Sequence, residues 1–156
     1  MEIGIIVYSQ TEHTYSVAQM LKDKLVVDGH SAKLERVVLS GNVKPGDKKN
    51  IKFEIAPDVS GYDALIFGAP VHAFSLAPPM DIYMTQLPSL QDKKIACFVT
   101  KGLPFSWTGG NSAIDRMKKI VESKNGSVNL TEVLVWGKNR NKKIGKMVQK
   151  FSSIFK

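Results

Sequence analysis

The sequence contains one cysteine, Cys97, and no apolar run that is long enough to cross a bilayer. A single thiol excludes an internal disulfide framework and a zinc or iron–sulfur site built from several thiolates. A membrane-spanning helix needs about 18–20 consecutive apolar residues. The first apolar run follows the acidic Glu2, so we expect no secretory signal. These absences favour a cytoplasmic protein that is not embedded in a membrane.

Several motifs that mark common enzyme classes are also missing. The sequence has no Gly-x-Gly-x-x-Gly and no Gly-Lys-Ser/Thr, which argues against dinucleotide and nucleoside triphosphate sites. It has no Ser-His-Asp arrangement at a recognisable spacing, no cluster of metal ligands and no paired carboxylates. Triad hydrolases, metalloenzymes and glycosidases are therefore disfavoured.

Acidic residues are missing from the last part of the chain. Residues 137–156 contain seven Lys or Arg and no Asp or Glu. The whole chain has 22 bases and 14 acids, so the first 136 residues hold 15 bases against 14 acids. Any attraction to an acidic partner or to nucleic acid therefore concerns the final segment alone.

The chain has 156 residues, of which 43% are hydrophobic, and we expect one domain over residues 1–156. Five short apolar runs predict buried strands; they are residues 3–8, 31–39, 63–69, 94–100 and 128–136. Four segments with helical spacing alternate with them; they are residues 14–27, 80–87, 112–123 and 141–155. Residues 40–58 lack a clear period, and we expect an irregular connection with a short extended piece at 51–55.

Alternating strands and helices predict a three-layer α/β fold with a parallel five-stranded sheet. Two strand orders are common for such sheets, 3-2-1-4-5 and 2-1-3-4-5, and periodicity does not choose between them. In both orders, ligands bind beyond the carboxyl ends of the strands. The loops after the first, third and fourth strands are therefore the candidate ligand-binding loops.

The first of these loops joins a strand directly to a helix and carries three hydroxyls, on Ser9, Thr11 and Thr14. A helix start offers unpaired N–H groups to an anion, and hydroxyls add further donors. The loop fits a single phosphomonoester. The same residues could instead form a capping box between a Ser or Thr and Glu12.

The second and third loops are unusual in other ways. Residues 70–79 place Phe74 and Leu76 where a solvated loop is expected, so this loop could offer an apolar edge to an aromatic ligand. Residues 100–111 form a long glycine-rich loop with Phe105 and Trp107, either of which could cover a planar ring. The alternative is that these apolar side chains simply pack on the protein's own body.

Together these features resemble flavodoxin-like FMN-binding proteins of the short-chain type. The string Ser-Gln-Thr-Glu-His-Thr after an apolar strand is similar to the family's phosphate loop, Ser/Thr-x-Thr-Gly-x-Thr. The segment Ala-Leu-Ile-Phe-Gly-Ala-Pro with the Phe74 loop is similar to the second FMN loop, and residues 100–110 to the third. The resemblance covers the whole chain in order, and it implies the 2-1-3-4-5 sheet with FMN across the strand ends.

The resemblance also implies which residues surround the FMN. Around the phosphate it places Ser9, Gln10, Thr11, Glu12, His13 and Thr14. On one side of the isoalloxazine it places Pro70, Val71, His72, Ala73 and Phe74. Along the other side, the ribityl chain and the pyrimidine edge it places Thr100, Lys101, Gly102, Leu103, Trp107, Gly109 and Gly110.

The sequence departs from the family pattern at three places. Glu12 stands where the family usually has glycine, so its carboxylate must face solvent or find a partner, and a protonated His13 could offset it. Residues 40–58 replace the family's second helix. No glycine lies between Val71 and Ser75, where a glycine in flavodoxins permits a peptide flip, which favours two-electron chemistry in this chain.

These observations predict an FMN-binding redox protein. No residue is a convincing general acid or base, so we expect electron transfer between protein partners, with an FMN-dependent reductase as the second possibility. The basic final helix would suit an acidic redox partner such as a ferredoxin better than nucleic acid. The alternative is that its cations form an ordinary solvated helix face. The alternative function is an FMN-free binding module that uses this helix to bind an acidic protein or nucleic acid.

Overall fold

The computed structural model describes residues 1–10, 12–41, 51–102, 108–137 and 139–155. Three residues that the sequence assigns to the candidate site, Thr11, Leu103 and Trp107, lie outside the described residues. Within the described part of the chain, no helix combines the length and apolar character that crossing a membrane requires.

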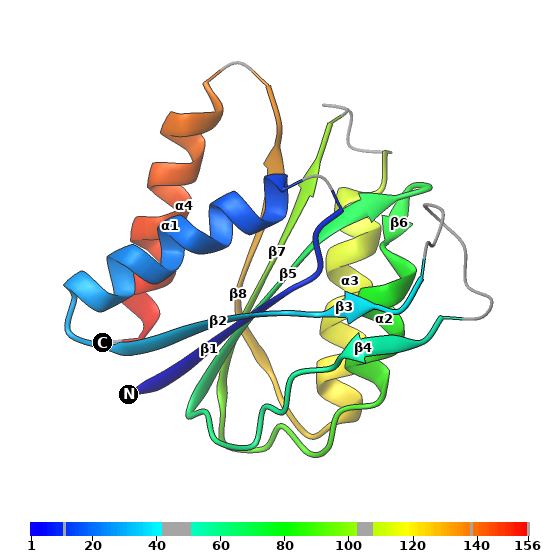
Figure 1. Ribbon diagram of the computed structural model, residues 1–156. Coiled ribbons are helices and arrows are strands. Elements are labelled where there is room, and N and C mark those ends of the chain that lie inside the picture. Colours follow the sequence, from blue (N-terminus) through cyan, green and yellow to red (C-terminus); the bar gives the residue numbers. More distant parts are fainter. Residues whose placement is uncertain (11, 42–50, 103–107, 138, 156) are drawn as a thin grey trace.

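Five parallel strands form the central sheet in the order β2-β1-β5-β7-β8 (Figure 1). Their bounds are β1 Glu2–Val7, β2 Ser31–Arg36, β5 Ala64–His72, β7 Lys94–Lys101 and β8 Val128–Val135. Numbered along the chain, these five strands stand in the order 2-1-3-4-5. The α/β class and the strand order that the resemblance implied are therefore confirmed.

Four helices cover the two faces of the sheet. The helices α1 His13–Val27 and α4 Arg140–Ile154 pack side by side on one face, and α2 Pro78–Thr85 and α3 Gly110–Ser123 pack on the other (Figure 1). All four helices expected from the sequence are present, with ends shifted by a few residues. The three layers follow from the crossovers that parallel strands require.

Side chains alternate between two apolar cores, one on each face of the sheet. In β1, Ile5 and Val7 face α1 and α4, whereas Ile6 faces α2 and α3. In β7, Phe98 joins the first core and Cys97 the second, and both are fully buried. This period of two explains why the central strands read as continuous apolar runs.

The described residues between β2 and β5 include a second, smaller sheet. A two-stranded antiparallel sheet stands there, formed by β3 Val38–Leu39 and β4 Phe53–Ile55. The ring of Phe53 meets that of Tyr83 edge-on at 6.3 Å, and the Tyr83 hydroxyl donates to the Pro57 carbonyl at 2.5 Å. The short extended piece expected at residues 51–55 is thus present as β4. It packs against the core on the α2 and α3 side.

Two sequence expectations about strand ends were wrong. The second strand was expected to reach Leu39 but leaves the main sheet after Arg36, because residues 38–39 pair with β4 instead. The third strand was expected to end at Ala69, with a loop beginning at Pro70. In the structure β5 continues to His72 and turns back into β6 Ser75–Leu76 as a hairpin.

Candidate functional site

The three loops singled out in the sequence lie at the same edge of the sheet. β1, β5 and β7 are adjacent and parallel, and they end at Val7, His72 and Lys101. Their carboxyl ends stand at the top of the molecule in Figure 1, beside the start of α1. A single ligand could therefore contact all three loops, as is usual for open α/β sheets.

The first loop turns into α1 through a left-handed residue. Glu12 is the N-cap of α1, and its φ is 65°. This conformation explains why a glycine is favoured at such a position, since a β-carbon is strained there. The Glu12 side chain makes no capping hydrogen bond to the helix. The capping box offered as an alternative interpretation is therefore not formed by Glu12.

Arg36 neutralises the Glu12 carboxylate. Its guanidinium Nη2 lies 2.9 Å from Glu12 Oε1 and also donates to the Ser9 carbonyl at 3.3 Å. The same guanidinium stacks over the Tyr15 ring, 4.5 Å from its centroid. Because 63% of the Glu12 side chain is exposed, the carboxylate faces solvent with a positive partner beside it.

Sequence reasoning missed Arg36. It is the last residue of β2 and pairs in register with Val7 at the end of β1. The 2-1-3-4-5 order places the end of the second strand beside the first loop. This order, together with the positive charge of Arg36, could have identified the partner of Glu12.

A buried hydroxyl in the first loop points to a ligand. Ser9 Oγ is buried and has no hydrogen-bond partner among the described residues. A buried polar atom without a partner is unusual in a folded protein and calls for an explanation. An anion oxygen held at the start of α1 would supply the missing partner.

The first and third loops are joined by a hydrogen bond between two buried threonines. Thr14 Oγ1 and Thr100 Oγ1 are 2.9 Å apart, and both residues are at most 3% exposed. A hydroxyl donates one hydrogen and has two lone pairs. One of the pair therefore still has its proton to donate elsewhere.

His13 is held by an aromatic stack at the end of the last strand. Its ring lies parallel to that of Trp136, with the centroids 4.1 Å apart and an interplanar angle of 9°. The guanidinium of Arg140 lies over the same indole, 5.3 Å from its centroid. Trp136 was interpreted as a core residue from the sequence; it touches the core only in part and also supports the first loop.

The second loop is the tight hairpin between β5 and β6. Its two central residues, Ala73 and Phe74, have φ values of 49° and 62°. Positive φ at both positions is the geometry of a type I′ turn, which matches the twist of a hairpin. The Phe74 side chain is 56% exposed, whereas Leu76 is buried in the core. Phe74 therefore presents an apolar ring at the edge where the three loops meet.

Gly109 brings the second and third loops into backbone contact. It is the N-cap of α3, with a φ of 105°. A β-carbon built on it would lie 2.3 Å from the Phe74 carbonyl carbon and oxygen. Behind this contact, Lys101 Nζ donates to Thr108 Oγ1 at 3.2 Å. The hairpin and the start of α3 are consequently fixed against each other.

His72 and Tyr8 lie behind the hairpin, edge to face, with ring centroids 6.2 Å apart. Burial lowers the pKa of His72 below its usual 6.5, and its Nδ1 is buried without a partner among the described residues. Burial raises the pKa of Tyr8 above 10, although its hydrogen bond with Gln10 opposes the shift. Both rings are therefore neutral at physiological pH.

Solved structures share this fold. Flavodoxin 2 from Bacillus cereus is 16% identical, with a TM-score of 0.71 over 98% of this chain and 99% of that chain. A flavodoxin from Streptococcus pneumonia TIGR4 is 13% identical, with a TM-score of 0.69 over 98% and 99%. A Fusobacterium nucleatum flavodoxin bound to flavin mononucleotide is 16% identical, with a TM-score of 0.67 over 99% of each chain.

The chain has the flavodoxin fold. No family model matches its sequence, and no curated protein matches it either. The likeness is thus carried by the architecture, at identities where few individual side chains coincide. Two local features of this chain lie near the site: a left-handed Glu12 paired with Arg36, and the β3–β4 sheet between β2 and β5.

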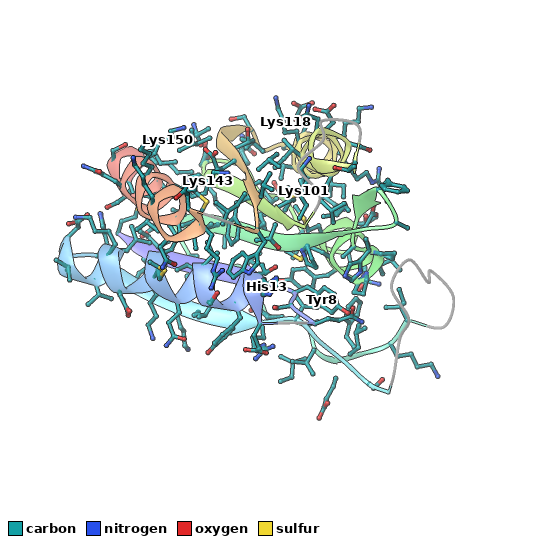
Figure 2. The ribbon with its side chains drawn as sticks, turned by 90° about the horizontal axis from the view of Figure 1, so that it is seen from above. Tyr8, His13, Lys101, Lys118, Lys143 and Lys150 are labelled. Atoms are coloured by element: carbon teal, nitrogen blue, oxygen red, sulfur yellow. The ribbon has the colours of Figure 1, made fainter. Side chains whose placement is uncertain are left out.

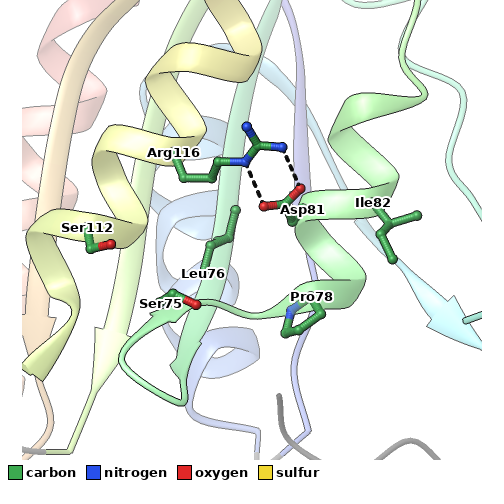
Figure 3. Close-up of a pocket in the computed structure, with 7 residues that line it drawn as sticks. All are labelled: Ser75, Leu76, Pro78, Asp81, Ile82, Ser112 and Arg116. Carbon is green, nitrogen blue, oxygen red and sulfur yellow. Dashed lines mark hydrogen bonds and ion pairs between the residues drawn. The ribbon is translucent and has the colours of Figure 1, made fainter. Parts of the chain in front are cut away.

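A separate pocket of about 360 Å³ lies on the other side of the hairpin, between α2 and α3 (Figure 3). Arg116 crosses from α3 to Asp81 on α2, with Nε and Nη2 at 2.7 and 3.0 Å from the two carboxylate oxygens. This ion pair and the hairpin residue Leu76 form part of the lining. No group of three or more potential metal ligands occurs among the described residues.

Proposed function

We propose that the protein binds FMN and carries electrons between protein partners. The observation that carries this proposal is the buried Ser9 hydroxyl without a described partner, placed where the flavodoxin fold turns from β1 into α1. FMN has one phosphate, an aromatic ring and a polar chain between them. The first loop would offer an anion site, the second the apolar ring of Phe74, and the third the buried hydroxyl of Thr100.

The first loop would hold the phosphate of the FMN. The N–H groups of the first turn of α1 point toward the loop, and the positive end of the helix dipole favours an anion there. Ser9 would donate its hydroxyl, and the proton left over from the Thr14–Thr100 pair would serve a second oxygen. Arg36 removes the repulsion that Glu12 would otherwise exert on the phosphate.

The hairpin and the third loop would enclose the flavin ring. Phe74 is exposed at the hairpin tip, and its backbone is fixed by Gly109, so that it could cover one side of the ring. When bound, FMN supplies the electron chemistry, and the protein sets its position and surroundings. His72 and Tyr8 lie behind the hairpin as neutral groups, so they add no net charge to the ring site.

Electron transfer between proteins is favoured over catalysis on a small substrate. Neither His72 nor Tyr8 has a pKa suited to general acid–base work near pH 7, because burial moves both away from neutrality. An FMN-dependent reductase that passes hydride is the second form of the same function. The hairpin supports this second form. Neither of its central residues is a glycine, so the peptide flip that a glycine permits in flavodoxins is disfavoured, and two-electron chemistry is favoured.

The experiment is a titration of flavin-free protein with FMN, followed by the quenching of flavin fluorescence. Ser9→Ala and Thr14→Val should each weaken binding about tenfold or more, the usual cost of losing a hydrogen bond to a charged group. Thr85→Val is the matched control, because Thr85 is an exposed hydroxyl on α2 that bonds its own helix. Unchanged affinity in both test variants would place the phosphate elsewhere.

The same titration separates the proposal from the FMN-free binding module. A colourless protein that does not quench added FMN would overturn the redox function. Glu12 was the main support for that alternative, since a carboxylate could occupy the anion's position. With Glu12 exposed and paired to Arg36, that support is lost.

A further inference from the structure

The helix α4 carries a row of cations on its solvent face. Arg140, Lys142, Lys143 and Lys146 are all exposed, and none forms an ion pair within the described part of the chain. Farther along, Lys150 lies 3.2 Å from Glu132 on β8. Residues 140–150 of α4 are hereafter called the basic face.

The positions of these cations destabilise the helix α4. The first turn of a helix is the positive end of its dipole, and cations are unfavourable there. Lys142 and Lys146 are four residues apart, Lys143 and Lys146 three, so like charges also face each other along the helix. The first turn of α4 contains no acidic residue to compensate.

The other amphipathic helix, α3, shows the arrangement that stability alone would favour. There Lys118 and Lys119 are interspersed with Asp115 and Glu122. The packing of α4 does not need its cations, because Met147 and Phe151 bury its inner side in the core. On α4 the charges oppose the helix dipole and repel one another, and packing gains nothing in return. Such a conflict with local stability is expected on a surface that serves binding.

The basic face begins beside the candidate FMN site. Arg140 stacks on Trp136, and Trp136 stacks on His13 at the start of α1. Seen from above the carboxyl edge in Figure 2, His13 lies between Tyr8 and the helix that carries Lys143 and Lys150. A protein docked on α4 would therefore lie next to the first loop.

We propose that the basic face of α4 is the docking surface for an acidic redox protein. This inference rests on the proposed FMN function. Positive charges beside the redox site would steer a partner with a negative surface and orient it on encounter. An acidic iron–sulfur protein would supply one electron per encounter, so two encounters would supply the two electrons that a bound FMN takes up when fully reduced.

Nucleic acid fits the basic face less well. Proteins that bind single strands combine cations with aromatic rings on which bases stack. On the described outer side of α4 there is no aromatic residue, since Phe151 and Phe155 are buried and Trp136 already contacts His13 and Arg140. The basic face also lies next to the candidate FMN site, a position that electron transfer requires and nucleic-acid binding does not.

The test compares two triple variants with the same change in net charge. Lys142, Lys143 and Lys146 are changed to Glu in one, and the exposed Lys33, Lys118 and Lys119 in the other. Each FMN-loaded protein is mixed with a reduced plant-type [2Fe–2S] ferredoxin, an acidic one-electron donor. The second-order rate of electron transfer is then followed by stopped flow at several salt concentrations.

In the α4 variant the rate at low salt should fall about tenfold or more, and its salt dependence should largely disappear. The control variant should keep most of the low-salt rate and most of its salt dependence. Equal losses in the two variants would overturn the proposal, because net charge alone would then explain them. Unchanged rates in the α4 variant would overturn it as well.

Two further measurements keep the failure of this inference distinct from that of the FMN function. FMN affinity is measured on each variant, and both triples should match the parent protein. If the parent does not bind FMN, the proposed function fails, and direct titration with ferredoxin then tests the basic face alone. Salt-sensitive binding of single-stranded DNA through α4, without binding of ferredoxin, would replace the acidic protein by nucleic acid.

Discussion

Glu12 holds a backbone conformation that side chains other than glycine rarely adopt. A left-handed residue with a β-carbon costs roughly 1–2 kcal/mol. The ion pair with Arg36 is exposed on both sides, and such pairs contribute only about 0–1 kcal/mol. The pair therefore compensates the strain in part at best. Its larger effect is to keep a negative charge away from the candidate phosphate position.

Two substitutions at Glu12 separate its charge from its conformation. Glu12→Gln and Glu12→Gly both remove the ion pair, but only glycine relieves the strain. We therefore expect the glycine variant to be about 1 kcal/mol more stable than the glutamine variant in urea unfolding. Equal stabilities would mean that the strain at φ 65° is negligible.

The buried His72 makes a second prediction at this scale. Its lowered pKa means that the unfolded chain takes up a proton before the folded protein does. The contribution of His72 to stability is therefore complete above about pH 6.5 and is lost as the pH falls below that value. The fall continues until the folded protein also protonates.

The measurement is the free energy of unfolding between pH 7.5 and about 5, compared between the parent protein and His72→Gln. The difference between the two should shrink or reverse as the pH falls, because glutamine does not titrate. His30→Gln, in the turn that follows α1, serves as the control for the loss of an imidazole elsewhere in the chain. A constant difference over the whole range would show that His72 titrates alike in both states.

At the scale of elements, strands and helices could be predicted well but turns could not. The buried runs around Ile5, Phe67 and Phe98 predicted three central strands, because only strands buried on both faces are apolar without a break. The hairpin at Ala73 and Phe74 was missed. Type I′ turns normally carry Asn and Gly, and these two residues give no such signal.

The small β3–β4 sheet was anticipated only in part for a related reason. Its strands have two and three residues, too few for a hydrophobic period to be recognised. The charged partner of Glu12 was missed because it comes from another strand. The edge at which the three loops meet was anticipated, since the carboxyl ends of neighbouring parallel strands lie together.

Gly109 should be the most sensitive small residue in the junction of loops and helices. Gly109→Ala would place a methyl group within 2.3 Å of the Phe74 backbone at a φ of 105°. Overpacking and left-handed strain together should cost about 2–4 kcal/mol. Gly61→Ala is the control, with open space around the new methyl group, and should stay within about 0.5 kcal/mol. Both are measured by denaturant unfolding of the FMN-free protein.

If Gly109→Ala and Gly61→Ala proved equally mild, the hairpin would have to move away from α3 without cost. Contact between the second and third loops would then not be a fixed part of the site. Amide hydrogen exchange at residues 71–76 distinguishes this outcome from simple tolerance, because a displaced hairpin loses protection.

On the scale of the whole molecule, the sheet separates two cores and hides the one thiol of the chain. Cys97 lies on the central strand β7, is fully buried, and has a pKa raised by burial to about 12. A thiol reagent needs both access and a thiolate. Neither is available until the sheet opens from its middle.

Reaction of Cys97 with a chromogenic disulfide should therefore follow global unfolding. Its rate should rise with urea in proportion to the unfolded population, and destabilising variants such as Gly109→Ala should react faster. Binding of FMN should slow the reaction in the same measure as it raises stability. Rapid reaction of the native protein at low urea would reveal a local opening around β7.

The row of cations on α4 has a consequence for how the free protein responds to its surroundings. Dissolved ions shorten the reach of a charge from about 30 Å at 0.01 M to about 10 Å at 0.1 M. Added sodium chloride should therefore raise the melting temperature of the unliganded protein. A triple variant should show the same rise in dilute buffer without added salt; its changes are Lys142→Gln, Lys143→Gln and Lys146→Gln. In dilute buffer, a bound anionic partner along α4 should stabilise the protein in the same way as added salt, because both weaken the repulsion between the cations.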